Sequence, residues 1–270
     1  MSTRVLLLTL LILLMIGGLM VGIFAGPIEQ ALTIPMMMMA DHNVTQPAKT
    51  PVSTTHATTP PPSPRTQAPG NIVDQDTFQR ANQVLWGTSS GNETWQGDAN
   101  NQQEQHIFSI VNANGQIANG QGNFNALLGQ ANSNEAVMAS GKVSHFSNGA
   151  NLGVVLRWND TNNWYKALID GKLLRIIRNF QGRTVNLSVL PFAAQDSTNY
   201  TLRFQAQGPT LSTKVWRTGT PEPDHWMSTV SDNTFASGQP GIRVVLRQGV
   251  TITIRSFQTT TIPMNTSITS

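Results

Sequence analysis

Short runs of alternating apolar and polar residues, separated by turn signals, dominate the middle of the chain. Between Asn151 and Trp226, runs rich in Val, Ile, Leu, Tyr and Trp are interrupted by NDTNN, by Asp170-Gly171, by Gln181-Gly182 and by QGP at residues 207–209. A period of two is typical of strands with one buried face, and turn signals about every 8–12 residues are typical of linked antiparallel strands. The stretch therefore predicts an antiparallel meander.

The same pattern continues on both sides of this stretch, and no segment has the 3.6-residue period of an amphipathic helix. The expected strands cover residues 76–80, 106–111, 136–146, 152–158, 163–170, 172–180, 183–190, 199–207, 210–217, 241–247 and 250–258. Many short strands without helices predict an all-β antiparallel β-sandwich, which we place at residues 71–258.

Alternation also assigns faces within each strand. Between residues 152 and 158, the even positions, ending at Trp158, are expected on one face, and the odd positions, ending at Arg157, on the other. By the same rule, Arg157, Arg203, Arg243 and Arg247 are expected on outward faces of the sandwich.

The N-terminal segment has a different pattern, because residues 5–25 are apolar or small and carry no charge. At about 1.5 Å per residue, a helix of this length spans the apolar core of a bilayer. Arg4 precedes the run, so everything after Ala25 is expected outside the cytoplasm. Residues 1–25 are therefore predicted to be a transmembrane anchor. The alternative is a signal peptide cleaved near Ala25-Gly26, which would release the domain as a secreted protein.

Residues 26–70 and 259–270 flank the predicted sandwich. From His42 to Gly70, Pro, Thr and Ser dominate without apolar periodicity, so this segment cannot bury enough surface to fold alone. We expect residues 26–70 to be a disordered linker that holds the domain away from the membrane, and residues 259–270 to be a flexible tail.

Composition and charge exclude several classes of function. Charged residues make up 11% of the 270 residues, the formal net charge is +3 and there is no cysteine. The chain therefore has no disulfide, zinc–thiolate site or catalytic thiol. Its Lys and Arg residues are dispersed, which does not predict a nucleic-acid partner.

The region from Asp76 to Phe257 resembles the concanavalin A-like lectin/glucanase superfamily, in its bacterial laminin-G-like jelly-roll branch. The opening motifs D-x-F-x-R and W-G-T…G…W are Asp76, Phe78, Arg80, Trp86, Gly87, Thr88, Gly91 and Trp95. The central motifs G-V-V-L-R and N-W-Y are residues 153–157 and 163–165. The closing motifs are Tyr200, Leu202, Arg203, Leu211, Lys214, Val215, Trp216, Gly219, Thr220, Glu222, Pro223, Trp226, Gly238 and Gly241.

The resemblance implies a jelly-roll sandwich, a fold that carries lectins, glycosidases, adhesion modules and structural domains. In related domains the last strand often carries an acidic residue followed by Asn, which can serve calcium. Here Arg255-Ser256 stands at that place, so calcium is possible but unsupported, and no cofactor or metal is predicted.

No catalytic residue is predicted from the sequence. A retaining glucanase needs two carboxylates about 5–5.5 Å apart, and the E-x-D-x-x-E pattern is absent. Glu222 and Asp224 lie in a proline-flanked turn, where a solvated or Lys-paired carboxylate is the simpler interpretation. His106 and His145 lie on different expected strands, so a catalytic triad is unsupported.

Carbohydrate binding is the more consistent activity, because sugar sites combine aromatic faces with planar amides and arginine. The candidate ligand-binding residues are Arg157, Asn162, Asn163 and Trp164, which flank one predicted turn. The main hypothesis is a membrane-anchored, non-catalytic sandwich outside the cell that binds carbohydrate or another cell-surface polymer.

Two alternatives remain open at this point. The first is a glycoside-active enzyme that uses dispersed carboxylates such as Asp76, Asp170 and Asp232. The second is a structural or protein-interaction module, in which the aromatic residues serve only the fold.

Overall fold

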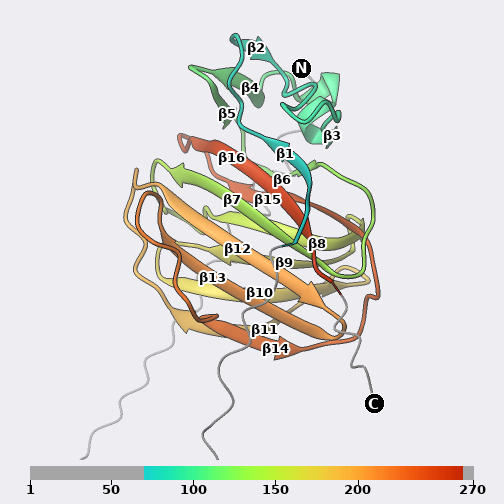
Figure 1. Ribbon diagram of the computed structural model, residues 1–270. Helices are drawn as coiled ribbons and strands as arrows, with labels where there is room; N and C mark the ends of the chain where they lie inside the picture. Colours follow the sequence, from blue (N-terminus) through green and yellow to red (C-terminus); the bar gives the residue numbers. More distant parts are fainter. Residues whose placement is uncertain (1–69, 264–270) are drawn as a thin grey trace, which may run out of the picture. The chain divides into compact units, whose positions relative to one another are not determined.

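The structure, a computed structural model, describes residues 70–263, which form two antiparallel β-sheets packed face to face (Figure 1). The expectation of an all-β antiparallel sandwich is confirmed. The helices of this region are two three-residue 3-10 turns, η1 (Asp98–Asn100) and η2 (Gln102–Glu104). Within residues 70–263, no helix is long and apolar enough to span a bilayer. The expected anchor at 1–25 and the linker up to residue 69 lie outside the described residues.

The larger sheet has nine strands, in the order β14-β13-β12-β7-β16-β5-β4-β2, with β1 also pairing with β16. Its strands are β1 (Ile72–Asp76), β2 (Gln83–Val84), β4 (Phe108–Val111), β5 (Asn114–Ile117), β7 (Glu135–Val143), β12 (Tyr200–Gln207), β13 (Thr210–Arg217), β14 (Ser228–Ser231) and β16 (Ile252–Thr261). Residue 259 was expected to begin a flexible tail, but β16 continues to Thr261. Thr259, within this strand, is fully buried.

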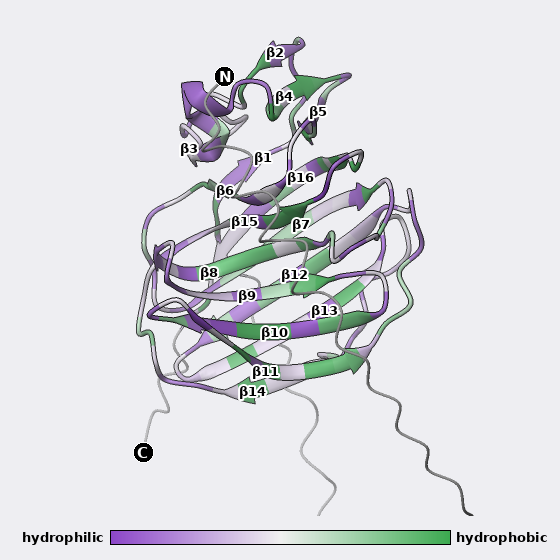
Figure 2. Ribbon diagram, turned by 180° about the vertical axis from the view of Figure 1, so that it is seen from behind, coloured by the Kyte–Doolittle hydropathy of each residue, from purple (hydrophilic) through white to green (hydrophobic). Residues whose placement is uncertain are grey.

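The second sheet has seven strands, in the order β11-β10-β9-β8-β15-β6-β3. They are β3 (Gln96–Gly97), β6 (Gly122–Leu127), β8 (Leu152–Asp160), β9 (Asn163–Ile169), β10 (Leu173–Phe180), β11 (Arg183–Pro191) and β15 (Gln239–Leu246). In Figure 2 the ribbon of β8 has one apolar and one polar stretch, in line with its burial, because residues 152–158 are buried and residues 159–160 are exposed.

One face of each sheet lies against the main hydrophobic core. Val154, Leu156 and Tyr165 of the seven-stranded sheet share this core with Leu202 and Phe204 of the nine-stranded sheet. The seven-stranded sheet also carries a second cluster of buried apolar residues, which is separate from the core. Both faces of that sheet are thus partly covered, which explains its mixed sequence pattern.

The segment that contains β2 to β5 and the 3-10 turns lies at one end of the sandwich (Figure 1) and is joined to it by an aromatic cluster. Trp86 and Trp95 are fully buried, with ring centroids 4.8 Å apart, and Trp95 reaches Phe257 of β16 at 5.1 Å. These two tryptophans therefore belong to the hydrophobic core, where they have no surface to offer a ligand.

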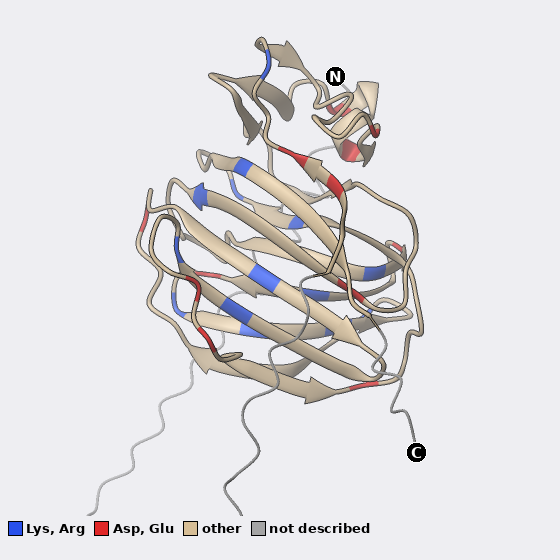
Figure 3. Ribbon diagram, viewed as in Figure 1, with Lys and Arg blue, Asp and Glu red and all other residues tan. Residues whose placement is uncertain are grey.

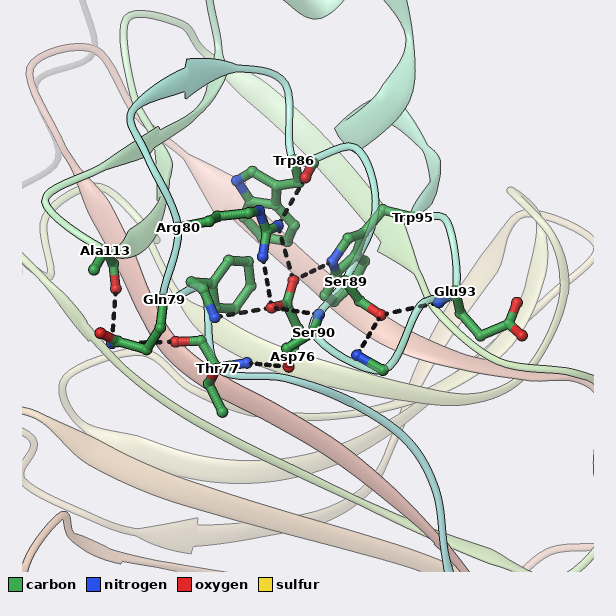
Figure 4. A network of polar contacts seen from close by, with 12 residues as sticks. Asp76, Thr77, Gln79, Arg80, Trp86, Ser89, Ser90, Glu93, Trp95 and Ala113 are labelled. Carbon is green, nitrogen blue, oxygen red and sulfur yellow. Dashed lines mark hydrogen bonds and ion pairs between the residues drawn. The ribbon is translucent and has the colours of Figure 1, made fainter.

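Asp76 organises the backbone beside this cluster (Figure 4). Its Oδ2 accepts the indole N–H of Trp95 at 2.7 Å, its Oδ1 accepts the backbone N–H of Phe78 at 2.8 Å, and Arg80 forms an ion pair with it at 2.8 Å. The predicted strand at 76–80 was therefore wrong. β1 ends at Asp76, and the next residues turn back over its carboxylate, with Phe78 at a positive φ of 55°.

A β-bulge interrupts β8 at Arg157 and corrects the predicted faces. Arg157 has a φ of 51°, and the register of β8 against both neighbours shifts at this point. As a result, Trp158 does not share the core face with Leu156 but lies with Val155 in the second cluster. The expected outward position of Arg157 was also wrong, because this residue is only 3% exposed.

Candidate functional site

The face of the seven-stranded sheet that points away from the core contains a hollow of about 470 Å³, which we call the sheet hollow. It arises from the strand period, since every second residue of β9, β10 and β15 points to this side. Its lining residues are Asn123, Gly149, Asn151, Thr161, Asn162, Trp164, Lys166, Leu168, Asp170, Arg175, Ile177, Asn179, Gly182, Thr184, Arg243 and Val245.

Apolar side chains form part of the floor of the sheet hollow. Trp164, Leu168 and Ile177 line it and belong to the second buried cluster, together with Trp158. The rings of Trp158 and Trp164 are parallel within 8°, and the Arg243 guanidinium lies 4.6 Å from the Trp164 centroid and 5.5 Å from that of Trp158. Cation–π contact with two indoles fixes this guanidinium on the floor.

Arg243 also takes part in a polar chain that leads away from the sheet hollow. Its Nη1 donates to Oδ1 of Asn125, and the Asn125 amide donates to Asp98 Oδ2 at 3.3 Å. Burial lowers the pKa of Arg243, and the nearby negative charge of Asp98 partly opposes that shift. The guanidinium is therefore held in place by neutral groups and by a carboxylate beyond Asn125.

Lys166 is the second cation on this floor, and it is 2% exposed. Its Nζ donates a hydrogen bond of 2.7 Å to Oδ1 of Asn151. Its stem crosses Gly153 of β8, where a Cβ atom would come within 2.2 Å of the Lys166 side chain. Burial, and secondarily the positive charge of Arg243, holds the pKa of Lys166 well below its usual value.

Polar groups form the rim of the sheet hollow. Arg175 and Asp170 form an ion pair of 2.7 Å, and the Thr184 hydroxyl donates to Asn179 Oδ1 at 2.8 Å. Asn162 adds an exposed amide. The rim therefore offers donors and acceptors in several orientations above a floor that is partly apolar and positively charged.

Three of the four candidate residues predicted from the sequence lie in the turn between β8 and β9 or at the start of β9. Asp160 accepts the backbone N–H of Asn162 at 2.7 Å and the Asn163 amide at 2.9 Å, and Asn163 Oδ1 in turn accepts the backbone N–H of Gln181 at 3.0 Å. Asn162 and Trp164 line the sheet hollow, whereas Asn163 braces the turn. Trp164 is 3% exposed and has its ring beside Arg243, so it shapes the floor and presents little open ring surface.

Arg157, the fourth candidate, does not line the sheet hollow. Its guanidinium donates to the carbonyl oxygens of Phe235, Ser133 and Gly208, at 2.7, 2.7 and 2.6 Å. These carbonyls belong to three separate segments of the chain. The geometry therefore gives Arg157 a fold-stabilising role in place of the expected ligand contact.

Sequence reasoning missed Lys166, Asn151, Arg175 and Asn179, and it placed Arg243 on an outward face without a role. A signal for Lys166 was present, because alternation along NWYKALI puts Trp164, Lys166 and Leu168 on one face. The partnership of Lys166 with Asn151 could not be found from the sequence, since it depends on how β8 and β9 are paired.

The dispersed carboxylates of the enzyme alternative each have an arginine partner. Asp76 pairs with Arg80, Asp170 with Arg175, and Asp232 with Arg178 at 2.6 Å. Asp232 also accepts the hydroxyl of Tyr165 at 2.5 Å. Within residues 70–263, no group of three or more His, Asp or Glu side chains is placed to hold a metal ion.

Solved structures with the same fold include two bacterial proteins. The carbohydrate-binding module CBM66 from Bacillus subtilis aligns with a TM-score of 0.50 and 16% identity, over 62% of this chain and 95% of that module. The GH43 protein BlXynB from Bacillus licheniformis aligns with a TM-score of 0.50 and 14% identity, over 69% of this chain but only 39% of that protein.

These identities establish a shared fold and nothing further. No protein-family model matches the chain. No curated protein matches it either.

Proposed function

We propose that residues 70–263 form a carbohydrate-binding domain and that the sheet hollow is its binding site. The observation that carries this proposal is the composition of the hollow: amides of Asn123, Asn162 and Asn179 surround a floor that includes Leu168 and Ile177. Sugars present hydroxyl groups beside apolar C–H faces, and planar amides can donate to one hydroxyl while accepting from another. The shared fold with CBM66 of Bacillus subtilis, a carbohydrate-binding module, supports this proposal.

Retention on polysaccharides tests the proposal. The full chain is applied to an array of soluble and insoluble polysaccharides, alongside a double variant, Asn123→Ala with Asn162→Ala. Both residues are exposed. Removing two ligand-facing amides should therefore spare the fold and lower the affinity about tenfold or more.

A matched control variant carries Gln102→Ala and Gln103→Ala, which remove two exposed amides on η2. It should bind as wild type does. Absence of binding to every polysaccharide would refute the proposed function, and equal binding by the two double variants would refute the proposed site.

We further propose the finer family assignment and the location that the sequence suggests. The domain is a jelly-roll member of the concanavalin A-like superfamily, of the bacterial laminin-G-like type. Residues 5–25 anchor it in a membrane, and residues 26–70 hold it outside the cytoplasm. The uncharged apolar run supports the anchor, and Arg4 supports the orientation.

Protease treatment of intact cells that express the full chain tests this location. Cleavage in the Pro/Thr-rich segment should release the domain into the medium, while residues 5–25 stay in the membrane fraction after alkaline extraction. A chain that resists protease until the cells are lysed would contradict the orientation.

A further inference from the structure

The sheet hollow has an unusual charge arrangement for a site that binds neutral sugars. Two of its floor residues are cations, Lys166 and Arg243, and neither forms an ion pair within residues 70–263. Figure 3 shows lysines and arginines on strands of both sheets. Of the two cations on the floor of the sheet hollow, Lys166 is the more deeply buried, at 2% exposed. A buried ammonium group with no carboxylate partner is costly, so this pair of residues requires a specific explanation.

We propose that the saccharide bound in the sheet hollow is acidic, and that its carboxylate or sulfate group lies against Lys166 Nζ and the Arg243 guanidinium. This inference rests on the proposed function. An ammonium group carries three donors. Lys166 donates one of them to Asn151 Oδ1, an acceptor that also receives the backbone N–H of Val245 at 3.2 Å. An anionic oxygen in the hollow could accept from the lysine and from Arg243 together.

The charges around Lys166 support an anion over a neutral hydroxyl group. On β15 the facing charge is Arg243, and on β10 it is Arg175, which is already paired with Asp170. On β8 the outward positions beside Lys166 are Gly153 and Val155, which are neutral. Asp98 lies beyond Asn125 and interacts with Arg243. The electrostatic potential on the floor is therefore positive, and an anionic group bound there would compensate the charge of the two cations.

The lowered pKa of Lys166 makes a second observable available. An anion beside Nζ stabilises the protonated lysine and raises its pKa, so binding should be coupled to uptake of a proton. A neutral saccharide has no such effect. Proton uptake is read from calorimetric titrations in two buffers of different ionisation enthalpy, in a pH series that runs up to 10.5, the unperturbed pKa of lysine.

The test compares charged saccharides with matched neutral ones by calorimetry on the full chain. The probes are trigalacturonate and its methyl ester, and a sulfated galactose trisaccharide and its unsulfated form. At least one charged probe should bind about tenfold or more tightly than its neutral counterpart, because a charge-assisted hydrogen bond is stronger than a neutral one. The charged probe that shows the preference identifies the anion as carboxylate or sulfate.

Two variants separate the sheet hollow from general charge effects. Lys166→Met should abolish the preference for the charged probe and the proton uptake, while Arg255→Gln, which removes an exposed arginine of β16, should change neither. If Lys166→Met fails to fold, judged by circular dichroism, the proton uptake of the wild-type protein decides the question.

Equal affinity for charged and neutral probes would overturn the acidic-saccharide inference and leave the proposed function standing. A preference that survives in folded Lys166→Met, or binding without proton uptake, would overturn it as well. Failure of all four probes, together with an empty polysaccharide array, would remove the proposed function itself.

Discussion

Lys166 shows how a single residue can link stability to binding. Its ammonium group is buried beside Arg243, with an amide oxygen as its hydrogen-bond partner. Without a ligand, this arrangement opposes folding at any pH at which the lysine is charged in the unfolded chain, because water hydrates the ammonium group there and folding removes that water. In our account the same group supplies a positive charge to the ligand site.

Replacing Lys166 by Met should therefore stabilise the free protein, by about 1 kcal/mol or more near neutral pH. The folded pKa of Lys166 is depressed below the unfolded value of 10.5, so the contribution of this residue to stability becomes less unfavourable as pH rises toward 10.5. The advantage of Lys166→Met should accordingly shrink between about pH 6 and pH 10. Urea unfolding of the wild-type protein and of Lys166→Met, at about pH 6 and at about pH 10, measures this difference in stability.

The control for this prediction is Lys172→Met, which removes an exposed lysine. It should leave both the stability and its pH dependence unchanged. If Lys166→Met were less stable than wild type at both pH values, the ammonium group would be a net stabiliser and the account of its burial would be wrong.

Glu135 is a second buried ionisable residue, at the start of β7. Burial, together with the charge of Asp74, raises the pKa of Glu135 to about 8, and its Oε2 is buried without a hydrogen-bond partner among the described residues. The folded state therefore binds a proton that the unfolded chain releases above about pH 4.5, its unperturbed pKa. The contribution of Glu135 to stability should fall as pH rises from about 4.5 to 8 and then level off.

Glu135→Gln should remove most of this pH dependence and should be more stable than wild type above pH 8, by about 1 kcal/mol or more. Thermal unfolding across the pH range measures the effect. Asp224→Asn, which neutralises an exposed carboxylate, is the control and should follow the wild-type curve. A wild-type stability that rises between pH 5 and pH 8 in step with Glu135→Gln would contradict the raised pKa.

At the scale of elements, the bulge in β8 determines the surroundings of Arg157 and Trp158. It places Trp158 beside Arg243 and turns Arg157 toward three carbonyl groups. The bulge packs closely against Gly238, where a Cβ atom would lie 2.4 Å from the carbonyl carbon of Arg157. A glycine is required there, since any larger residue would meet backbone.

Arg157→Met should destabilise the protein by about 3 kcal/mol or more, because it leaves three carbonyl groups without their donor. Arg247→Met, which removes a partly exposed guanidinium bonded to the Asn148 carbonyl, should cost less than about 1 kcal/mol. Chemical unfolding of both variants checks this prediction. If Arg157→Met kept wild-type stability but lost saccharide binding, Arg157 would be a ligand contact after all.

The elements with strong apolar alternation were predicted from the sequence, and those whose form depends on distant contacts were not. The runs that became β8, β9, β10, β12 and β13 were found, while β6 (GNFNAL) and β14 (STVS) were missed because their residues are largely polar or small. The bulge at Arg157 was missed because it depends on pairing with β15, far along the chain. Asn162, in the turn, and Trp164, in β9, were named as candidate ligand contacts from local pattern alone, and both line the hollow.

At the scale of the molecule, the two faces of the seven-stranded sheet have separate roles. One face closes the main core with the nine-stranded sheet, and the other carries the sheet hollow. Because β9, β10 and β15 supply both faces, the rigidity of the core positions the cations and amides of the hollow. In our proposal, residues 5–25 and 26–70 determine where this surface is displayed.

The most direct test of the account is the footprint of a bound oligosaccharide on the full chain, measured by amide hydrogen exchange. The probe is the oligosaccharide form of the polysaccharide that the array retains best. We expect protection concentrated on β9, β10 and β15 and on the turn between β8 and β9, with no change on β12 and β13. Protection confined to the outer face of the nine-stranded sheet, or none at saturating saccharide, would contradict the assignment of the sheet hollow as the binding site.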